Sequence, residues 1–102
     1  MPDFVLSREA ALDLEDIWEY IAIDSVSAAD GLIDKLFNAF SLLAQSPGIG
    51  HLRRDLTAHS ILYWSVGGYL IIYRALPERI EIIAVAEGSR DIPRFISSRF
   101  TT

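Results

Sequence analysis

The sequence contains no cysteine and a single lysine among its 102 residues. The lack of cysteine excludes a disulfide scaffold and a thiolate metal site, and it is compatible with a reducing compartment. No apolar run approaches the roughly twenty residues that a membrane-spanning helix needs. The start, Met1 to Phe4, has neither the basic residues nor the apolar stretch of a signal peptide. We therefore expect a cytoplasmic protein without a membrane segment.

The chain has material for one hydrophobic core and little more. Its hydrophobic fraction is 51%, which makes an intrinsically disordered chain very improbable. A length of 102 residues suits one domain and is too short for two. We expect a single domain over residues 1–102.

Charge is distributed unevenly along the sequence. Residues 1–50 carry nine acidic and two basic side chains, whereas residues 51–102 carry five acidic side chains and seven arginines. The net charge of −5 therefore combines a strongly acidic first half with a mildly basic second half. Arginine offers a planar fork of donors that suits carboxylates and phosphates. The sequence leaves open an ordinary solvated surface or a second half that meets an acidic partner.

The first half predicts a short strand over residues 3–6 and then two helices. Ser7 is suited to be the N-cap of the first helix, whose apolar stripe runs at helical spacing from Ala10 to Ile21. Ser27 is expected to cap the second helix, with Asp30 three residues later as in a capping box. Residues 45–50 end that helix because they contain proline and glycine. The short break between the helices predicts an antiparallel helical hairpin.

The second half predicts three strands after an irregular polar stretch. Residues 51–60 are expected to be irregular, and strands are expected at 61–66, 69–74 and 80–86, with a turn at Gly67-Gly68. Helices first and strands last predict an α+β fold with the helices packed on one face of an antiparallel sheet. Large apolar residues occupy both faces of several strands, so we expect the C-terminal tail or a partner to cover the other face.

The sequence shows no catalytic set. His51 and His59 lack the spacing and the third ligand of a metal site, and Gly48 and Gly50 do not form a dinucleotide-binding loop. We predict no metal, no cofactor and no catalytic residue. One enzymatic alternative stays open, namely a metal-free ribonuclease in which Arg53, Arg54, Arg74 and Arg90 surround a phosphate. The other explanation for each arginine of the second half is a surface ion pair or a side-chain stem packed over apolar surface, and it is favoured for Arg79 and Arg99.

The order and spacing of several phrases resemble the ParE branch of the RelE/ParE toxins of bacterial toxin–antitoxin systems. The resemblance extends from Leu6 to Phe95. It rests on the first helix from Leu6 to Ile21, on Ala28-Ala29-Asp30, Pro47-Gly48-Ile49-Gly50 and Arg54-Asp55-Leu56, and on Tyr69-Leu70-Ile71-Ile72-Tyr73-Arg74 and Gly88-Ser89-Arg90-Asp91-Ile92-Pro93. It implies a fold of one strand, a helical hairpin and then an antiparallel sheet, with the first strand beside the last.

The same resemblance implies a function and partners. It implies a growth-inhibitory toxin that poisons DNA gyrase and forms a hetero-oligomer with a ParD-like antitoxin. Many relatives carry histidine immediately before the Gly-x-Arg-Asp phrase, but this chain has Glu87, whose charge would repel phosphate. Together with the acidic net charge, this difference argues against strong direct binding of nucleic acid.

Two alternatives to a gyrase poison stay open. One is a RelE-like, ribosome-dependent endoribonuclease that cleaves messenger RNA, and the other is a degenerate, non-toxic module that binds the antitoxin. In each case we expect the same group of residues to bind the antitoxin or the target. These residues are Arg53, Arg54, Arg74, Arg90, Asp91, Arg94 and Phe95.

Overall fold

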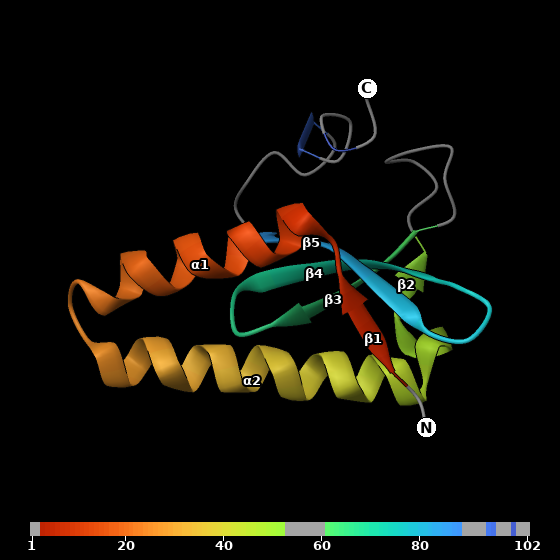
Figure 1. Cartoon of the computed structure of the whole chain (residues 1–102), viewed down its shortest axis with the longest axis horizontal. Coiled ribbons are helices and arrows are strands. Elements are labelled where there is room, and N and C mark those ends of the chain that lie inside the picture. The colour runs from red at the N-terminus through yellow and green to blue at the C-terminus, as the bar shows by residue number, and fades with distance from the viewer. Residues whose placement is uncertain (1–2, 53–60, 89–93, 96–98, 100–102) are drawn as a thin grey trace.

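The computed structural model describes residues 3–52, 61–88, 94, 95 and 99 (Figure 1). A short strand comes first, two helices lie side by side after it, and the other strands of the same sheet follow, as the sequence predicts. The elements are β1 (Phe4–Leu6), α1 (Arg8–Ala22), α2 (Val26–Gln45), a 3-10 turn (Pro47–Ile49), β2 (His51–Leu52), β3 (Leu62–Val66), β4 (Tyr69–Ala75) and β5 (Ile80–Glu87).

The described strands form one mixed sheet in the order β1-β5-β4-β3-β2. The β3–β4 and β4–β5 pairs are antiparallel, whereas β1 runs parallel to β5. The expected neighbourhood of the first and last strands is therefore confirmed, and the crossover from β1 to β5 is what makes the sheet mixed. Gly67 and Gly68 form the β3–β4 turn with φ angles of +53° and +85°, which favour glycine.

A serine is the N-cap of each helix, but the N-cap of α2 is not the serine that the sequence predicted. The Ser7 hydroxyl accepts a hydrogen bond from the Ala10 amide at 3.0 Å, which confirms the expected N-cap of α1. The cap of α2 is Ser25, whose hydroxyl accepts from the Ala28 amide at 3.0 Å. The prediction of Ser27 was wrong, because extended backbone at Ser25 already presents its hydroxyl to the helix start.

Asp30 likewise has a different role from the predicted capping box. Its carboxylate accepts a hydrogen bond from the Trp18 indole nitrogen at 2.8 Å. Trp18 belongs to α1 and Asp30 to α2, so this contact joins the two helices of the hairpin. The sequence predicted that Asp30 caps its own helix, whereas in the structure Asp30 connects α2 to α1.

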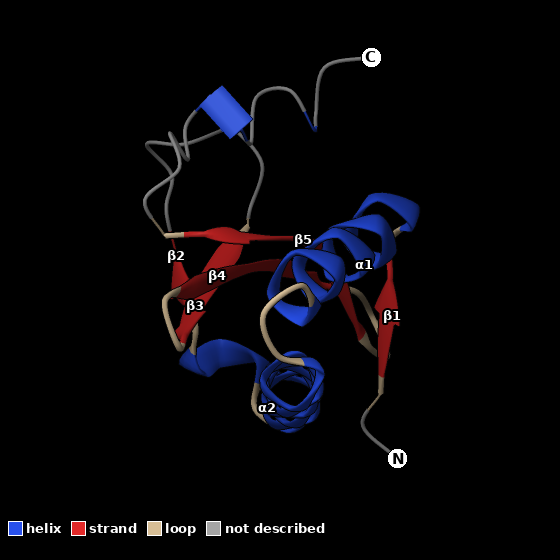
Figure 2. Cartoon of the chain, turned by 90° about the vertical axis from the view of Figure 1, so that its left-hand side faces the viewer, coloured by secondary structure: helices blue, strands red, loops and turns tan. Residues whose placement is uncertain are grey.

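The main core lies between the helices and one face of the sheet. Leu14 of α1 and Phe40 of α2 are buried against Ile71 and Tyr73 of β4 and Ile82 of β5. This arrangement confirms the prediction that both helices cover one sheet face. Figure 2 shows α2 below the sheet and the described part of the C-terminal segment on the other side.

The second sheet face has a smaller core of its own. Ile72 of β4 and Ile83 and Ala84 of β5 are buried there together with Ile61, and Phe95 packs against them. The sequence left open whether the tail or a partner covers this face. The structure shows that at least Phe95 of the C-terminal segment does so.

The stretch predicted as irregular over residues 51–60 begins with a strand. His51 and Leu52 form β2, which pairs with Tyr63 and Leu62 of β3. Two residues are too few to produce an alternating pattern, so the partner strand defines β2. Residues 53–60 lie outside the described part of the chain.

Candidate functional site

Strand β5 has one edge that β1 covers over a short length. β1 pairs with residues 80–82, after which the chain turns at Ser7 into α1. Backbone groups farther along β5 need other partners, because an unpaired buried amide or carbonyl is costly. Side chains supply them: the Ser7 hydroxyl donates to the Ile83 carbonyl at 3.0 Å, and the Val85 amide donates to Asp13 Oδ2 at 3.0 Å.

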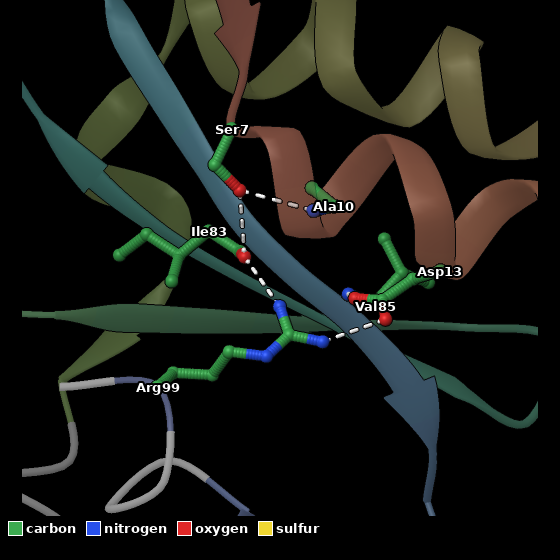
Figure 3. Close-up of polar contacts among 6 residues, drawn as sticks. All are labelled: Ser7, Ala10, Asp13, Ile83, Val85 and Arg99. Carbon is green, nitrogen blue, oxygen red and sulfur yellow. Dashed lines mark hydrogen bonds and ion pairs between the residues drawn. The ribbon is translucent and has the colours of Figure 1, made fainter. Parts of the chain in front are cut away.

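Arg99 completes this network from the far end of the chain. Its Nη1 donates to the Ile83 carbonyl at 3.0 Å and its Nη2 lies 2.6 Å from Asp13 Oδ1 (Figure 3). The guanidinium also lies over the Phe95 ring, 4.6 Å from its centre. The side chains of Arg99 and Asp13 are 16% and 15% exposed, so this ion pair is largely buried. Of the two expectations for Arg99, a surface ion pair or a stem packed over apolar surface, the first is therefore wrong.

Arg74, Arg94 and Phe95 are the predicted site residues that the structure describes. The Arg74 Nε donates to Glu81 Oε1 at 2.7 Å across the β4–β5 pair. Arg94 is exposed, and Phe95 packs on the second face of the sheet. Arg53, Arg54, Arg90 and Asp91 lie outside the described residues.

A hollow of about 240 Å³ on that second face is lined by both Arg74 and Arg99. Glu9, Glu81 and Ile83 also line it. Each of the two guanidiniums already binds a carboxylate. Arg74 and Arg99 therefore lie next to acids of this chain, which lowers their attraction for a phosphate.

A larger groove of about 380 Å³ opens between α1 and the strand ends of β4 and β5. Val85, Ala86 and Ile17 give it an apolar lining, and Tyr20 and Tyr69 give it aromatic walls. Its acids are Asp13, Asp16 and Glu87. These residues come from the three elements α1, β4 and β5, so no local sequence pattern brings them together, and Glu87 alone stood out in the sequence.

The surroundings of the groove change the pKa of Tyr69. The pKa of the Tyr69 phenol is raised above its ordinary value of 10.0, first by burial and then by the nearby charges of Glu87 and Tyr20. Burial disfavours the phenolate, and the Glu87 carboxylate opposes a second negative charge. The acids that line the groove likewise make it unfavourable for anions.

The described residues hold no group of three histidine, cysteine or acidic side chains that could bind a metal ion. Along residues 3–52, 61–88, 94, 95 and 99, no helix combines the length and apolar character needed to cross a bilayer.

Comparisons with known proteins place this geometry in a family. Among solved structures, one described as "Chromosomal ParDE TA system from P. aeruginosa" has a similar fold, with a TM-score of 0.71 and 18% sequence identity over 85% of this chain and 96% of that one. A search of curated proteins gives no match. The family model for the ParE toxin of the type II toxin–antitoxin system parDE matches residues 4–92. The chain therefore belongs to the ParE toxin family.

Proposed function

We propose that this protein inhibits growth by poisoning DNA gyrase and that direct binding of a ParD-like antitoxin neutralises it. The observation that carries the proposal is the match of the ParE toxin model to residues 4–92, which include helices α1 and α2 and strands β1 to β5. Action on gyrase would take place in the cytoplasm. The partners would be gyrase as the target and an antitoxin in a hetero-oligomer.

The charge around β5 favours this function over cleavage of RNA. Glu87 stands at the end of β5, and Asp13 and Asp16 line the same groove. A ribonuclease without a metal needs cations around the scissile phosphate. The carboxylates of Asp16 and Glu87, which no arginine neutralises within the described residues, would repel the substrate there, so a protein target suits this surface better than a phosphate backbone.

Exposed apolar side chains support the binding of a partner. Tyr20 and Ile23 near the end of α1 are 71% and 81% exposed, and Val26 at the start of α2 is 54% exposed. Large apolar side chains grouped at one end of a helical hairpin are typical of protein interfaces. For the antitoxin or the target we retain the proposed arginine surface of Arg53, Arg54, Arg74, Arg90, Asp91, Arg94 and Phe95.

A supercoiling assay tests the proposal. Purified protein should stop gyrase from supercoiling relaxed plasmid or should trap cleaved plasmid, and added antitoxin should restore supercoiling. Plasmid incubated with the protein but without gyrase is the control and should stay intact. Gyrase that works normally with the protein well above stoichiometric amounts, or cleavage of ribosome-bound messenger RNA, would contradict the proposal.

Arg90→Ala tests the proposed surface. We expect this change to weaken growth inhibition or antitoxin affinity, because arginine forks bind carboxylates strongly. Arg79→Ala removes the same charge from an exposed position between β4 and β5 and serves as the matched control. Growth arrest and antitoxin affinity that are unchanged in Arg90→Ala would place the binding surface elsewhere.

A further inference from the structure

The groove between α1 and the ends of β4 and β5 combines three features that suit an organic cation. Its volume of about 380 Å³ accommodates a large side chain, its walls are Tyr20 and Tyr69, and its acids come from both α1 and β5. Aromatic faces attract cations, and Arg guanidiniums in particular stack on them. A simple anion would meet carboxylates instead of donors.

Two of the carboxylates are available to a ligand. Both oxygens of Asp13 are engaged, one by Arg99 and the other by the Val85 amide. Asp16 and Glu87 are exposed and form no ion pair within the described part of the chain. They approach the groove from different elements, so a planar fork of donors suits them better than a single point charge.

The chain itself shows the same recognition at the neighbouring position. Arg99 binds the Asp13 carboxylate and a β5 carbonyl while its guanidinium lies over the Phe95 ring. Asp13 also lines the groove, so the two positions share one carboxylate. An arginine against β5 with a carboxylate and an aromatic ring is therefore an arrangement that this fold already stabilises.

From these contacts we propose that the groove binds an arginine side chain presented by a segment of a partner protein. Apolar residues beside that arginine would lie on Ile17, Val85 and Ala86, and the exposed ring of Tyr20 would close over the guanidinium. The residues that line this groove are different from those of the proposed arginine surface for an acidic segment. It does not depend on gyrase being the target, so the gyrase assay and the test below can fail independently.

The test is a titration of ¹⁵N-labelled protein with N-acetyl-arginine amide, followed by two-dimensional NMR. We expect saturable shifts of amides in and around residues 13–20, 69 and 85–87, with affinity that falls as salt is raised. N-acetyl-citrulline amide has nearly the same shape without the charge and should bind several-fold more weakly. N-acetyl-lysine amide should also bind more weakly, because its ammonium lacks the fork.

Matched variants locate the site. Glu87→Gln and Asp16→Asn should each weaken binding of the arginine amide several-fold, whereas Glu78→Gln makes the same change of charge at the opposite end of the β4–β5 hairpin and should leave it unchanged. All three positions are exposed, and an unperturbed spectrum without ligand verifies folding. Equal binding of citrulline, tighter binding of lysine, no saturable shift, or equal effects of Glu87→Gln and Glu78→Gln would overturn the proposal.

Discussion

Gly50 is constrained by a neighbouring side chain rather than by its own backbone angles. Its φ of −70° suits any residue, but an added Cβ would overlap the hydroxyl of Tyr73. Tyr73 is fully buried, and its hydroxyl donates to the Pro47 carbonyl at 2.7 Å. The tyrosine thus fixes the chain between α2 and β2, and it has little room to move away.

Gly50→Ala should therefore destabilise the protein by about 1–3 kcal/mol, as is usual for overpacking. Gly48→Ala is the matched control, because nothing lies within 4 Å of its added Cβ. Urea unfolding followed by tryptophan fluorescence measures both. Similar midpoints for the two variants would contradict the steric explanation.

Tyr73 should also make stability depend on alkaline pH. Burial raises the pKa of its phenol above 10.0, and the Gly50 backbone lowers it by a smaller amount. The unfolded chain then loses this proton first, so the free energy of unfolding is unaffected below pH 10 and falls as pH rises above it. Tyr73→Phe should flatten this fall, as measured by urea unfolding between pH 8 and 11. An equally steep fall in Tyr73→Phe would exclude this residue as a source.

At the scale of elements, the start of α2 distinguishes two serines that look equivalent in the sequence. Ser25 accepts from the Ala28 amide, whereas Ser27 lies exposed in the first turn of the helix. Ser25→Ala should cost about 1 kcal/mol, the usual value for loss of an N-cap. Ser27→Ala should change the free energy of unfolding little, and a larger loss in Ser27→Ala than in Ser25→Ala would place the cap two residues later.

The C-terminal segment is attached to the sheet by Arg99 and Phe95. Arg99→Ala removes the contacts to Asp13 and Ile83 and leaves a buried carboxylate with one donor fewer. We expect a loss of about 1–3 kcal/mol, typical of charge-assisted hydrogen bonds. Arg79→Ala removes an exposed arginine between β4 and β5 and should cost much less. Thermal unfolding compares the two, and equal stabilities would mean that the Arg99 network contributes nothing.

At the scale of the whole molecule, the net charge of −5 opposes general binding to nucleic acid. Two of the arginines, Arg74 and Arg99, reinforce this, because both are paired with acids of the same chain. We expect no appreciable binding to random duplex DNA at physiological salt, as measured by fluorescence anisotropy. Tight binding with a steep dependence on salt would show that a local cluster of cations outweighs the net charge.

Local pattern was sufficient for most of the architecture. The 3.6-residue stripe from Ala10 to Ile21, the Gly67-Gly68 turn and the apolar strands could be read from neighbouring residues, because helices and hairpins depend on short-range spacing. The order of these elements predicted the α+β fold and, with the family resemblance, the place of β1 beside β5. Strand β2 was missed because two residues carry no period.

The sequence by itself determined both helices, the longer strands, the lack of disulfides and the acidic helical half. Only the tertiary structure decided which charges meet. Asp13 and Arg99 are 86 positions apart, and they form an ion pair because α1 and the C-terminal segment both reach the edge of β5 that β1 leaves uncovered. The groove arises for the same reason, since Tyr20, Tyr69 and Glu87 approach one another through packing across elements, which no local pattern encodes.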